Sequence, residues 1–314
     1  MSIKLITVGD ANVDFIVSVN SLPEKGGETR VPTFEMHAGG SAANTCVAAQ
    51  RLGLKSGFIG RVGSEFFGRF LKREFRKEGV DISQLQTDGK VNSGFMFIMT
   101  TPDGERTMLC SRGANTRLAL REIDTDYVKD TNNLHISGYS FLEPPQRDAV
   151  RQVVKVAENE DCQISLDPGI LALKESLEEI ESIMPSVDLL FLNKRELRIL
   201  SDIEDIEVAG RQFLEMGPST VVLKLGGEGC LALAKGRKSF AKAFPINIVD
   251  TTGAGDAFDA TFIVGLERGW DLNKITKFAN ATGAISATKI GARSALPTFS
   301  EVEKFLSGEA GVEN

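Results

Sequence analysis

The sequence predicts an α/β fold in which helices cover both faces of a mostly parallel sheet. Apolar runs of strand length alternate with segments of helical periodicity from about residue 121 onward. Polar or glycine-rich segments follow these runs, at the carboxyl ends of the predicted strands, where parallel sheets bind their ligands. The predicted strands are 134–137, 163–167, 189–192 and 221–225, and the predicted helices lie near 145–159, 174–184, 194–200 and 206–216.

At 314 residues, with 42% hydrophobic and 25% charged residues, the chain has the composition of an ordinary soluble protein with room for one large core. Its net charge of -7 argues against a surface for nucleic acid or anionic membranes. We expect a cytoplasmic protein, because the first residues do not resemble a signal peptide and no apolar run is long enough to span a bilayer. The four cysteines and two histidines show no metal-ligand spacing, and we expect the cysteines to be reduced and buried.

The apolar run 5–8 predicts a buried first strand that ends in a polar segment. If the chain continues extended, Asn12 and Asp14 point to one face, while Val13 and Phe15 point to the other. An amide and a carboxylate on a fixed strand can donate to and accept from a diol. A polar turn is the alternative interpretation of the same residues.

A further strand, 30–37, is expected at a sheet edge because it contains a proline. It leads into Gly39 and Gly40 and then into a helix of small residues. This segment lacks the third glycine of a dinucleotide-binding fingerprint. Residues 55–62 predict the next strand, and a heavily charged helix follows to about Glu78.

Two more strand-like runs, 94–99 and 107–110, are joined by a Pro-Asp-Gly turn signal at 101–104. Together with 15–20 and 30–37 they are expected to form a small separate sheet. The first of the two runs is apolar on both faces, so either a second copy of the chain or the chain's own core must cover it.

The stretch 250–258 is the most informative part of the sequence. It follows a short apolar run, 246–249, which we predict as a strand, and it leads into a segment of helical spacing. Residues 253–255 are small enough for a phosphate to approach the N–H groups that open the helix. A carboxylate beside an anion site needs a chemical task, and Asp256 can accept the proton of a hydroxyl that attacks phosphorus. A tight turn with an acidic residue at the start of a helix is the alternative.

The residues from Asp250 to Phe258, Asp-Thr-Thr-Gly-Ala-Gly-Asp-Ala-Phe, resemble the C-terminal signature of the ribokinase (PfkB) family of carbohydrate kinases, which also contains nucleoside kinases. The segment 39–44 resembles the N-terminal signature, and further matches extend over nearly the whole chain. The resemblance implies a Rossmann-like ribokinase fold, with a single α/β kinase domain over residues 1–306 and a frayed tail at 307–314. It also implies a lid sheet, which often forms a homodimer interface, with strands inserted at about 15–20, 30–37 and 94–111.

The resemblance assigns roles to the residues of both signatures. Asp256 would be the base that deprotonates the acceptor, and Gly253, Ala254 and Gly255 would form an anion hole. The residues assigned to the acceptor are Asn12, Asp14, Gly39, Gly40, Ser41 and Asn44, with Tyr139 at the end of the strand 134–137. Ribokinases proper tend to carry Lys where this chain has Ser41, which is closer to the nucleoside-kinase version.

The resemblance also implies a site for ATP and Mg²⁺. Asn193 and Glu196 match a motif, Asn-x-x-Glu, that helps to position magnesium, usually through water; a helix cap with an exposed Glu is the alternative. Lys224 would either neutralise phosphate or solvate the rim of the site. The residues assigned to the nucleotide are Asn193, Lys224, Gly226, Gly227 and Asn280. In members activated by K⁺, the ion is coordinated at the positions that match Asp250, Thr252, Ser286, Lys289 and Gly291.

We therefore predict an ATP-dependent kinase that phosphorylates a hydroxyl of a small sugar-like molecule. A nucleoside kinase and a catalytically idle, ligand-binding relative are the alternatives. A phosphorylated acceptor is not expected, because the segments assigned to the acceptor show no cluster of Lys or Arg. Neither nucleic acid nor a membrane is expected as a partner.

Overall fold

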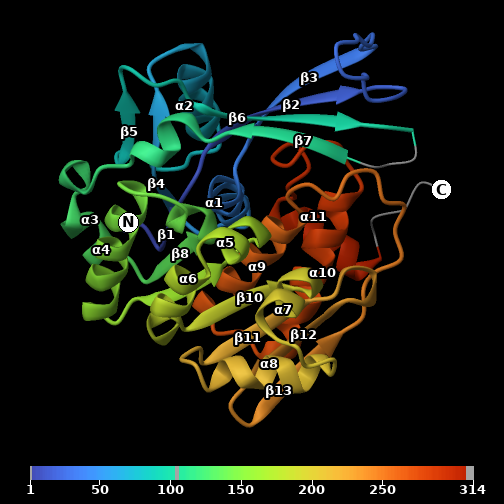
Figure 1. Ribbon diagram of the computed structural model, residues 1–314. Helices are drawn as coiled ribbons and strands as arrows, with labels where there is room; N and C mark the ends of the chain where they lie inside the picture. The colour runs from blue at the N-terminus through green and yellow to red at the C-terminus, as the bar shows by residue number, and fades with distance from the viewer. Residues whose placement is uncertain (1, 103–105, 309–314) are drawn as a thin grey trace.

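The protein is described by a computed structural model over residues 2–102 and 106–308, and two sheets organise it (Figure 1). The strands of the larger, nine-stranded sheet are β1 (Leu5–Val8), β4 (Ser56–Gly63), β5 (Leu85–Asp88), β8 (Asn133–Ser137), β9 (Gln163–Asp167), β10 (Leu189–Asn193), β11 (Thr220–Lys224), β12 (Cys230–Ala234) and β13 (Arg237–Ala241). Their spatial order is β13-β12-β11-β10-β9-β8-β1-β4-β5, and every neighbouring pair from β5 to β11 is parallel. The predicted α/β class with a mostly parallel sheet is confirmed.

Helices cover both faces of the larger sheet because the side chains of its strands alternate between two cores. In β1, Leu5 belongs to one core and Ile6 to the other, and in β10 Phe191 and Leu192 divide in the same way. The first core is closed by α1 (Ser41–Arg51), α2 (Phe66–Lys77), α9 (Ala254–Glu267), α10 (Leu272–Ala287) and α11 (Phe299–Ser307). The second is closed by α3 (Thr125–Lys129), α4 (Gln146–Asn159), α5 (Ile170–Glu175), α6 (Leu177–Ile183), α7 (Lys194–Leu200) and α8 (Ile206–Leu214). The described residues also form the 3₁₀ turns η1 (Gly113–Arg117), η2 (Leu120–Glu122), η3 (Gly138–Phe141), η4 (Met184–Ser186) and η5 (Gly226–Glu228).

The smaller sheet, here called the lid, contains β2 (Asn12–Ser18), β3 (Thr33–Gly39), β6 (Gly94–Thr100) and β7 (Arg106–Ser111) in the order β3-β2-β6-β7. It extends across the top of the view in Figure 1. The strand β2 begins shortly after β1 ends, so the chain continues extended and Asn12 and Asp14 share a face, as predicted; the lid strand expected at 15–20 begins earlier, at Asn12. The strand β3 begins directly after Pro32 and lies at the sheet edge, also as predicted. Residues 103 and 104 of the expected turn and 309–314 of the expected tail lie outside the described residues.

The strand predicted at 246–249 is wrong. The chain from residue 242 to 250 is irregular, and Val249 N–H donates to the Ala287 carbonyl at the end of α10 at 2.9 Å. Ile248 and Val249 are mostly exposed, at 65% and 55%. A short apolar run does not by itself specify a strand, and here the larger sheet already ends at β13, so the run has no strand to pair with.

The strands β5, β12 and β13 were not predicted from the sequence. One helix was predicted at 174–184, where the structure has two, α5 and α6. The strand β12, Cys-Leu-Ala-Leu-Ala, contains no β-branched or aromatic residue and so has little strand preference. Antiparallel pairing with β11 and burial of every residue hold it in place. Ser176 interrupts the predicted helix with an extended φ of -144°, which ends α5 and precedes α6.

The cysteines differ in part from expectation. All four are free, and Cys46, Cys162 and Cys230 are buried, but Cys110 on β7 is exposed. Its strand lies at the edge of the lid, and Cys110 lines the cavity described below. No helix within residues 2–102 and 106–308 combines the length and apolarity that crossing a membrane requires.

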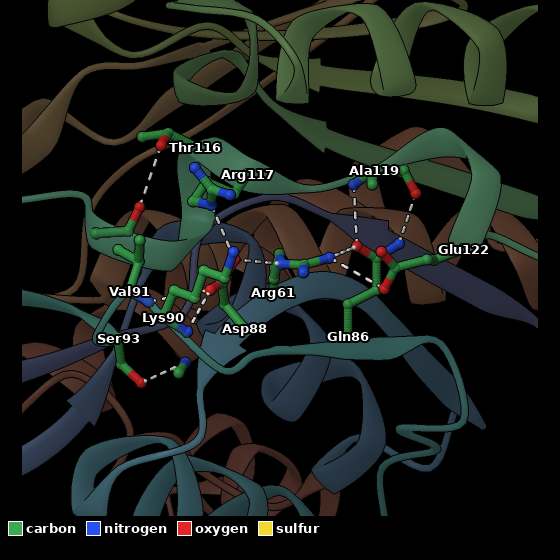
Figure 2. A network of polar contacts seen from close by, with 12 residues as sticks. Arg61, Gln86, Asp88, Lys90, Val91, Ser93, Thr116, Arg117, Ala119 and Glu122 are labelled. Carbon is green, nitrogen blue, oxygen red and sulfur yellow. Dashed lines mark hydrogen bonds and ion pairs between the residues drawn. The ribbon is translucent and has the colours of Figure 1, made fainter.

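At the β5 edge of the larger sheet, Asp88 gathers two arginines into a polar network (Figure 2). Its Oδ2 accepts from Arg61 Nε at 3.1 Å and from Arg117 Nε at 2.8 Å, while its Oδ1 accepts from the N–H groups of Lys90 and Val91. Burial alone would raise the pKa of this carboxyl, but the hydrogen bonds and the charge of Arg61 hold the pKa well below its usual range. The network fastens η1 to β4 and β5.

We expect Asp88→Ala to lower the free energy of unfolding by about 3 kcal/mol, because it leaves the Arg61 side chain, which is only 11% exposed, without one of its carboxylate partners. Because the pKa of Asp88 is depressed, its contribution is present above the unfolded pKa of about 3.9 and declines as the pH falls below that value. Urea unfolding at pH 7 and pH 3 measures both effects, and the difference between wild type and variant should be smaller at pH 3. An equal difference at both pH values would contradict this account.

Arg117→Ala is the matched control. The Arg117 side chain is 51% exposed, so losing its ion pair with Asp88 should cost about 1 kcal/mol or less. A loss as large as that of Asp88→Ala would show that the network does not depend on the buried carboxylate.

Candidate active site

A cavity of about 190 Å³ opens between the lid and the carboxyl ends of the central strands. Its lining brings together most of the residues that the sequence assigned to the acceptor and the base. These are Asn12, Asp14, Gly40, Ser41, Asn44, Tyr139 and Asp256. They come from β2, the start of α1, η3 and the first turn of α9, so segments more than two hundred residues apart in the chain meet at one site.

Asp256 is held at this cavity by two side chains of α1. Its Oδ1 accepts from the Ser41 hydroxyl at 2.8 Å, and its Oδ2 accepts from Asn44 Nδ2 at 2.8 Å. Burial raises the pKa of Asp256, while the hydrogen bonds from Asn44 and Ser41 oppose that shift. A carboxylate with a raised pKa in a cavity that can hold a hydroxyl has the properties of a proton acceptor.

The glycine turn before Asp256 opens α9 as predicted. Gly253 is left-handed, with φ 79°, and a Cβ there would lie only 2.7 Å from the Ala292 carbonyl oxygen, so the turn requires glycine. The helix begins at Ala254, whose N–H donates to the Thr251 carbonyl at 3.2 Å. The N–H groups of Gly255 and Asp256 precede the bond from Ala257 N–H to the Gly253 carbonyl, at 2.9 Å. An added Cβ at Gly255 would have one neighbour within 4 Å among the described atoms outside the helix backbone, Lys224 Nζ at 3.6 Å.

Asn12 and Asp14 share a face of β2, but their surroundings differ. Asn12 Oδ1 accepts from Asn115 Nδ2 at 2.8 Å, which fixes the orientation of its amide. Asp14 is buried, and burial raises its pKa to about 7, with the charge of Arg293 acting in the opposite direction. A Cβ at Gly39 would overlap the Asp14 carboxylate, so this glycine permits the close approach of β3 to β2.

Three polar residues around this site were not foreseen from the sequence: Arg112, Asn115 and Arg293. Arg112 lines the cavity, and its Nε and Nη2 bind Asp10 at 2.9 and 3.0 Å. Its Nη1 binds Glu143 at 3.2 Å, so its charge is largely compensated. The cavity therefore contains one arginine, from outside the segments assigned to the acceptor, and the expectation of an unphosphorylated acceptor stays a prediction. In the sequence, the only indication of Arg112 was Asp10, the acidic residue that follows β1 and forms an ion pair with it.

Lys224 is enclosed by carboxylates and does not lie at an exposed rim. Its Nζ is 2.7 Å from Asp167 Oδ2 and 3.0 Å from both oxygens of Asp259, and its side chain is 13% exposed. Burial and the neighbouring Asp167 raise the pKa of Asp259 well above its usual range, whereas the pKa of Asp167 is lowered by Lys224 and by a hydrogen bond from Asp259. The charged form is therefore disfavoured at Asp259 and favoured at Asp167. Asp259 was another residue that the sequence did not single out.

Asn193 and Glu196 form a capping box at the start of α7. Asn193 Oδ1 accepts from Glu196 N–H at 3.0 Å, and Glu196 Oε2 accepts from Asn193 N–H at 2.8 Å. The helix-cap interpretation is thus confirmed, but Glu196 is buried, not exposed, and burial together with the charge of Asp167 raises its pKa to about 7. Among the described residues, no group of three or more His, Cys, Asp or Glu side chains could hold a metal ion, so the predicted contact of Glu196 with Mg²⁺ stays a prediction.

The other residues assigned to the nucleotide lie near the end of the larger sheet. Gly226 and Gly227 form η5 after β11, and a Cβ at either would meet no described atom within 4 Å. Asn280 Nδ2 donates to the carbonyls of Ala241 and Lys242, at 2.8 and 3.1 Å. Its donors thus tie α10 to the end of β13, and a polar contact with adenine stays a prediction.

The residues assigned to K⁺ lie in two connected segments. Asp250 Oδ1 accepts from Thr252 N–H at 2.9 Å, and its Oδ2 accepts from Gly291 N–H at 3.0 Å. Ser286 and Lys289 lie on the turn that leaves α10, where Lys289 N–H approaches the Ser286 carbonyl at 3.5 Å. The five residues are therefore brought into one region through Asp250, while their part in binding an ion stays a prediction.

A mostly parallel α/β sheet, a cavity under a lid and a glycine turn that presents Asp256 are typical of small-molecule kinases. The chain is a phosphotransferase with an alcohol group as acceptor. It belongs to the pfkB family of carbohydrate kinases, whose sequence model matches residues 2–299. This confirms the family resemblance and the ribokinase fold.

Individual relatives cover nearly the whole chain. The ribokinase of Haemophilus influenzae is 29% identical over 312 residues, which are 96% of this chain and 98% of that protein. A solved structure of an E. coli protein in complex with ATP and Mg²⁺ has a TM-score of 0.88 at 26% identity, and the match covers 98% of this chain and 100% of that one. The nucleoside kinase of Methanocaldococcus jannaschii has a TM-score of 0.81 at 25% identity, with 98% and 99% covered.

Proposed function

We propose that this chain transfers the γ-phosphoryl group of ATP to a hydroxyl of a sugar-like molecule, with Asp256 as the general base. The observation that carries the proposal is the position of Asp256, which lies at the acceptor cavity in the first turn of α9 and is held by Ser41 and Asn44. Similarity to a ribokinase, and to a protein solved with ATP and Mg²⁺, supports the nature of both substrates.

In the proposed mechanism the cavity orients the acceptor, and the glycine turn stabilises the negative charge on the transferred phosphoryl group. Asn12 and Asp14 bind acceptor hydroxyls and direct one of them toward Asp256, which takes the proton as that hydroxyl attacks phosphorus. The N–H groups of residues 253–255, at the start of α9, stabilise negative charge on the transferred group. In this scheme Gly39 and Gly40 let the backbone approach the acceptor, and Tyr139 closes one side of the cavity.

Mg²⁺ would supply charge neutralisation of the nucleotide phosphates, and Glu196 with Asn193 would hold it through water. Their environment fits a cation, because the burial and negative charge that raise the pKa of Glu196 are what a nearby cation would offset. We assign Lys224, Gly226, Gly227 and Asn280 to the walls of the nucleotide site. The residues around Asp250 are proposed to hold K⁺, with Thr252, Ser286, Lys289 and Gly291 contributing oxygen atoms.

A nucleoside is the second candidate acceptor, and one observation favours it. The lid side of the cavity is apolar, with Phe95, Ile98 and Met108 in its lining, and a planar base could pack there. The cavity volume argues for the smaller molecule, since about 190 Å³ is below the roughly 300–1,000 Å³ of pockets for drug-sized ligands. We therefore place a free sugar or sugar acid first.

We also propose a homodimer formed through the lid. Phe34 and Leu109 on the lid strands are 59% and 60% exposed, an apolar pair that a second lid would cover. The retained Asp256, its two hydrogen-bond donors and the glycine turn argue against a catalytically idle relative.

A substrate panel tests the proposed acceptor. We expect ADP to be released from MgATP with a sugar or sugar acid, and the phosphorylated product to be detected by mass spectrometry. The control is MgATP without acceptor, which measures background hydrolysis. Release with nucleosides alone would establish the second candidate, and release with no member of a broad panel, although ATP binds, would contradict the proposal.

A further inference from the structure

We infer that Arg293 is a positioning residue for Asp256, acting through the side-chain amide of Asn44; this inference rests on the proposed function. Arg293 lies in the loop between α10 and α11, outside every segment assigned to the acceptor or the nucleotide. Its side chain is buried, with 5% of the residue exposed, and it reaches α1 across 249 residues of sequence.

The first contact fixes which way Asn44 faces. Arg293 Nε donates to Asn44 Oδ1 at 3.3 Å, and a guanidinium has donors only, so the amide must turn its oxygen to Arg293. The amide nitrogen, Nδ2, is then directed to Asp256, where it donates at 2.8 Å. Without Arg293 the amide could rotate and present its oxygen to the Asp256 carboxylate, which would repel it.

The second contact of Arg293 is with the backbone at the end of β3. Arg293 Nη2 donates to the Gly39 carbonyl at 3.0 Å, at the point where β3 ends against the Asp14 carboxylate. The positive charge of Arg293 also opposes the rise in the pKa of Asp14. One guanidinium thus contacts both segments that would hold the acceptor and the base in register.

The environment of Arg293 is an unusual one for a residue that merely fastens a loop. It packs over the ring of Phe75, with its Cζ 4.4 Å from the ring centroid, and within the described part of the chain its Nη1 has no hydrogen-bond partner. Burial lowers its pKa to about 10, so the group remains charged at neutral pH. A buried charge with an unsatisfied donor is costly, and an apolar side chain would fill the same space at less cost. Orientation of Asn44 and of the Gly39 backbone gives this arginine a function that an apolar side chain cannot supply.

The test is a double-mutant cycle on kcat. Arg293→Met keeps the length and the packing on Phe75 but removes the donors, and we expect kcat to fall roughly 10- to 100-fold while the KM for ATP stays unchanged. Because the effect on Asp256 passes through Asn44, Arg293→Met should lower kcat much less in the Asn44→Ala background than in the wild-type protein. Effects that multiply in the double variant, or an unchanged kcat in Arg293→Met, would overturn the inference.

Arg51→Met is the matched control, because Arg51 also fastens this loop, through the Leu296 carbonyl, without touching Asn44 or Asp256. It should alter stability, and its effect on kcat should be the same with and without Asn44. A crystal structure of Arg293→Met tests the inference without any assay: Asn44 Nδ2 should leave Asp256, and an unchanged contact of 2.8 Å would overturn it. Wild-type protein inactive on every acceptor would instead count against the proposed function.

Discussion

Asp256→Asn should lower kcat for phosphoryl transfer by about a hundred- to ten-thousand-fold. The amide keeps the size of the carboxylate and can still contact Ser41, but it cannot accept a proton from the acceptor hydroxyl. Binding of ATP should change little, because the assigned nucleotide residues lie elsewhere. Steady-state kinetics with the acceptor found in the panel, together with calorimetric titration of ATP, would measure both quantities.

Ser41→Ala is the control for Asp256→Asn. It removes one donor to the carboxylate and leaves the base in place, so its loss of kcat should be much smaller than that of the Asn variant. Turnover in Asp256→Asn within a few-fold of wild type would show that another group takes the proton or that none is needed.

Lys224→Met should be the most destabilising of the substitutions considered, with a loss of about 3–5 kcal/mol in the free energy of unfolding. Lys224 is the cation between Asp167 and Asp259, and its removal would leave a buried carboxylate uncompensated. Urea unfolding followed by circular dichroism measures the loss. If the loss is too large for the variant to accumulate, the same comparison can be made from thermal unfolding in cell lysate.

Asp259→Asn is the informative comparison for Lys224→Met. Burial and the charge of Asp167 raise the pKa of Asp259 well above its usual range, so its charged form is disfavoured, and an amide of the same shape can still donate to Asp167. We therefore expect Asp259→Asn to lower the free energy of unfolding by about 1 kcal/mol or less, near the lower end of the range for single substitutions. A loss as large as that of Lys224→Met would mean that Asp259 is ionised and that the charges are arranged differently from our account.

The parts of the site that were predictable from the sequence are those set by local periodicity. Asn12 and Asp14 share a face of β2 because side chains alternate along a strand, and Asp256 opens α9 because a glycine turn precedes an apolar helical pattern. Element positions followed in the same way for β8, β9, β10 and β11.

The residues that were missed act through partners remote in sequence. Arg112 binds Asp10 across 102 residues, and Arg293 binds Asn44 across 249, so no spacing rule links either pair. Asp259 follows Asp256 by less than one helical turn, but only the sheet, which places Lys224 beneath α9, distinguishes the two carboxylates. The strand predicted at 246–249 was wrong for a related reason, since a strand exists only where a neighbouring strand can pair with it.

The central claim is that Asp256 accepts a proton from a substrate hydroxyl in the cavity beneath the lid. A crystal structure of the wild-type protein with a non-hydrolysable ATP analogue, Mg²⁺ and the acceptor tests it most directly. We predict one acceptor hydroxyl within about 3.2 Å of an Asp256 oxygen, with the terminal phosphate of the analogue facing the N–H groups of residues 253–255. An acceptor whose hydroxyls all lie beyond hydrogen-bond reach of Asp256, with the phosphate bound away from the glycine turn, would contradict it.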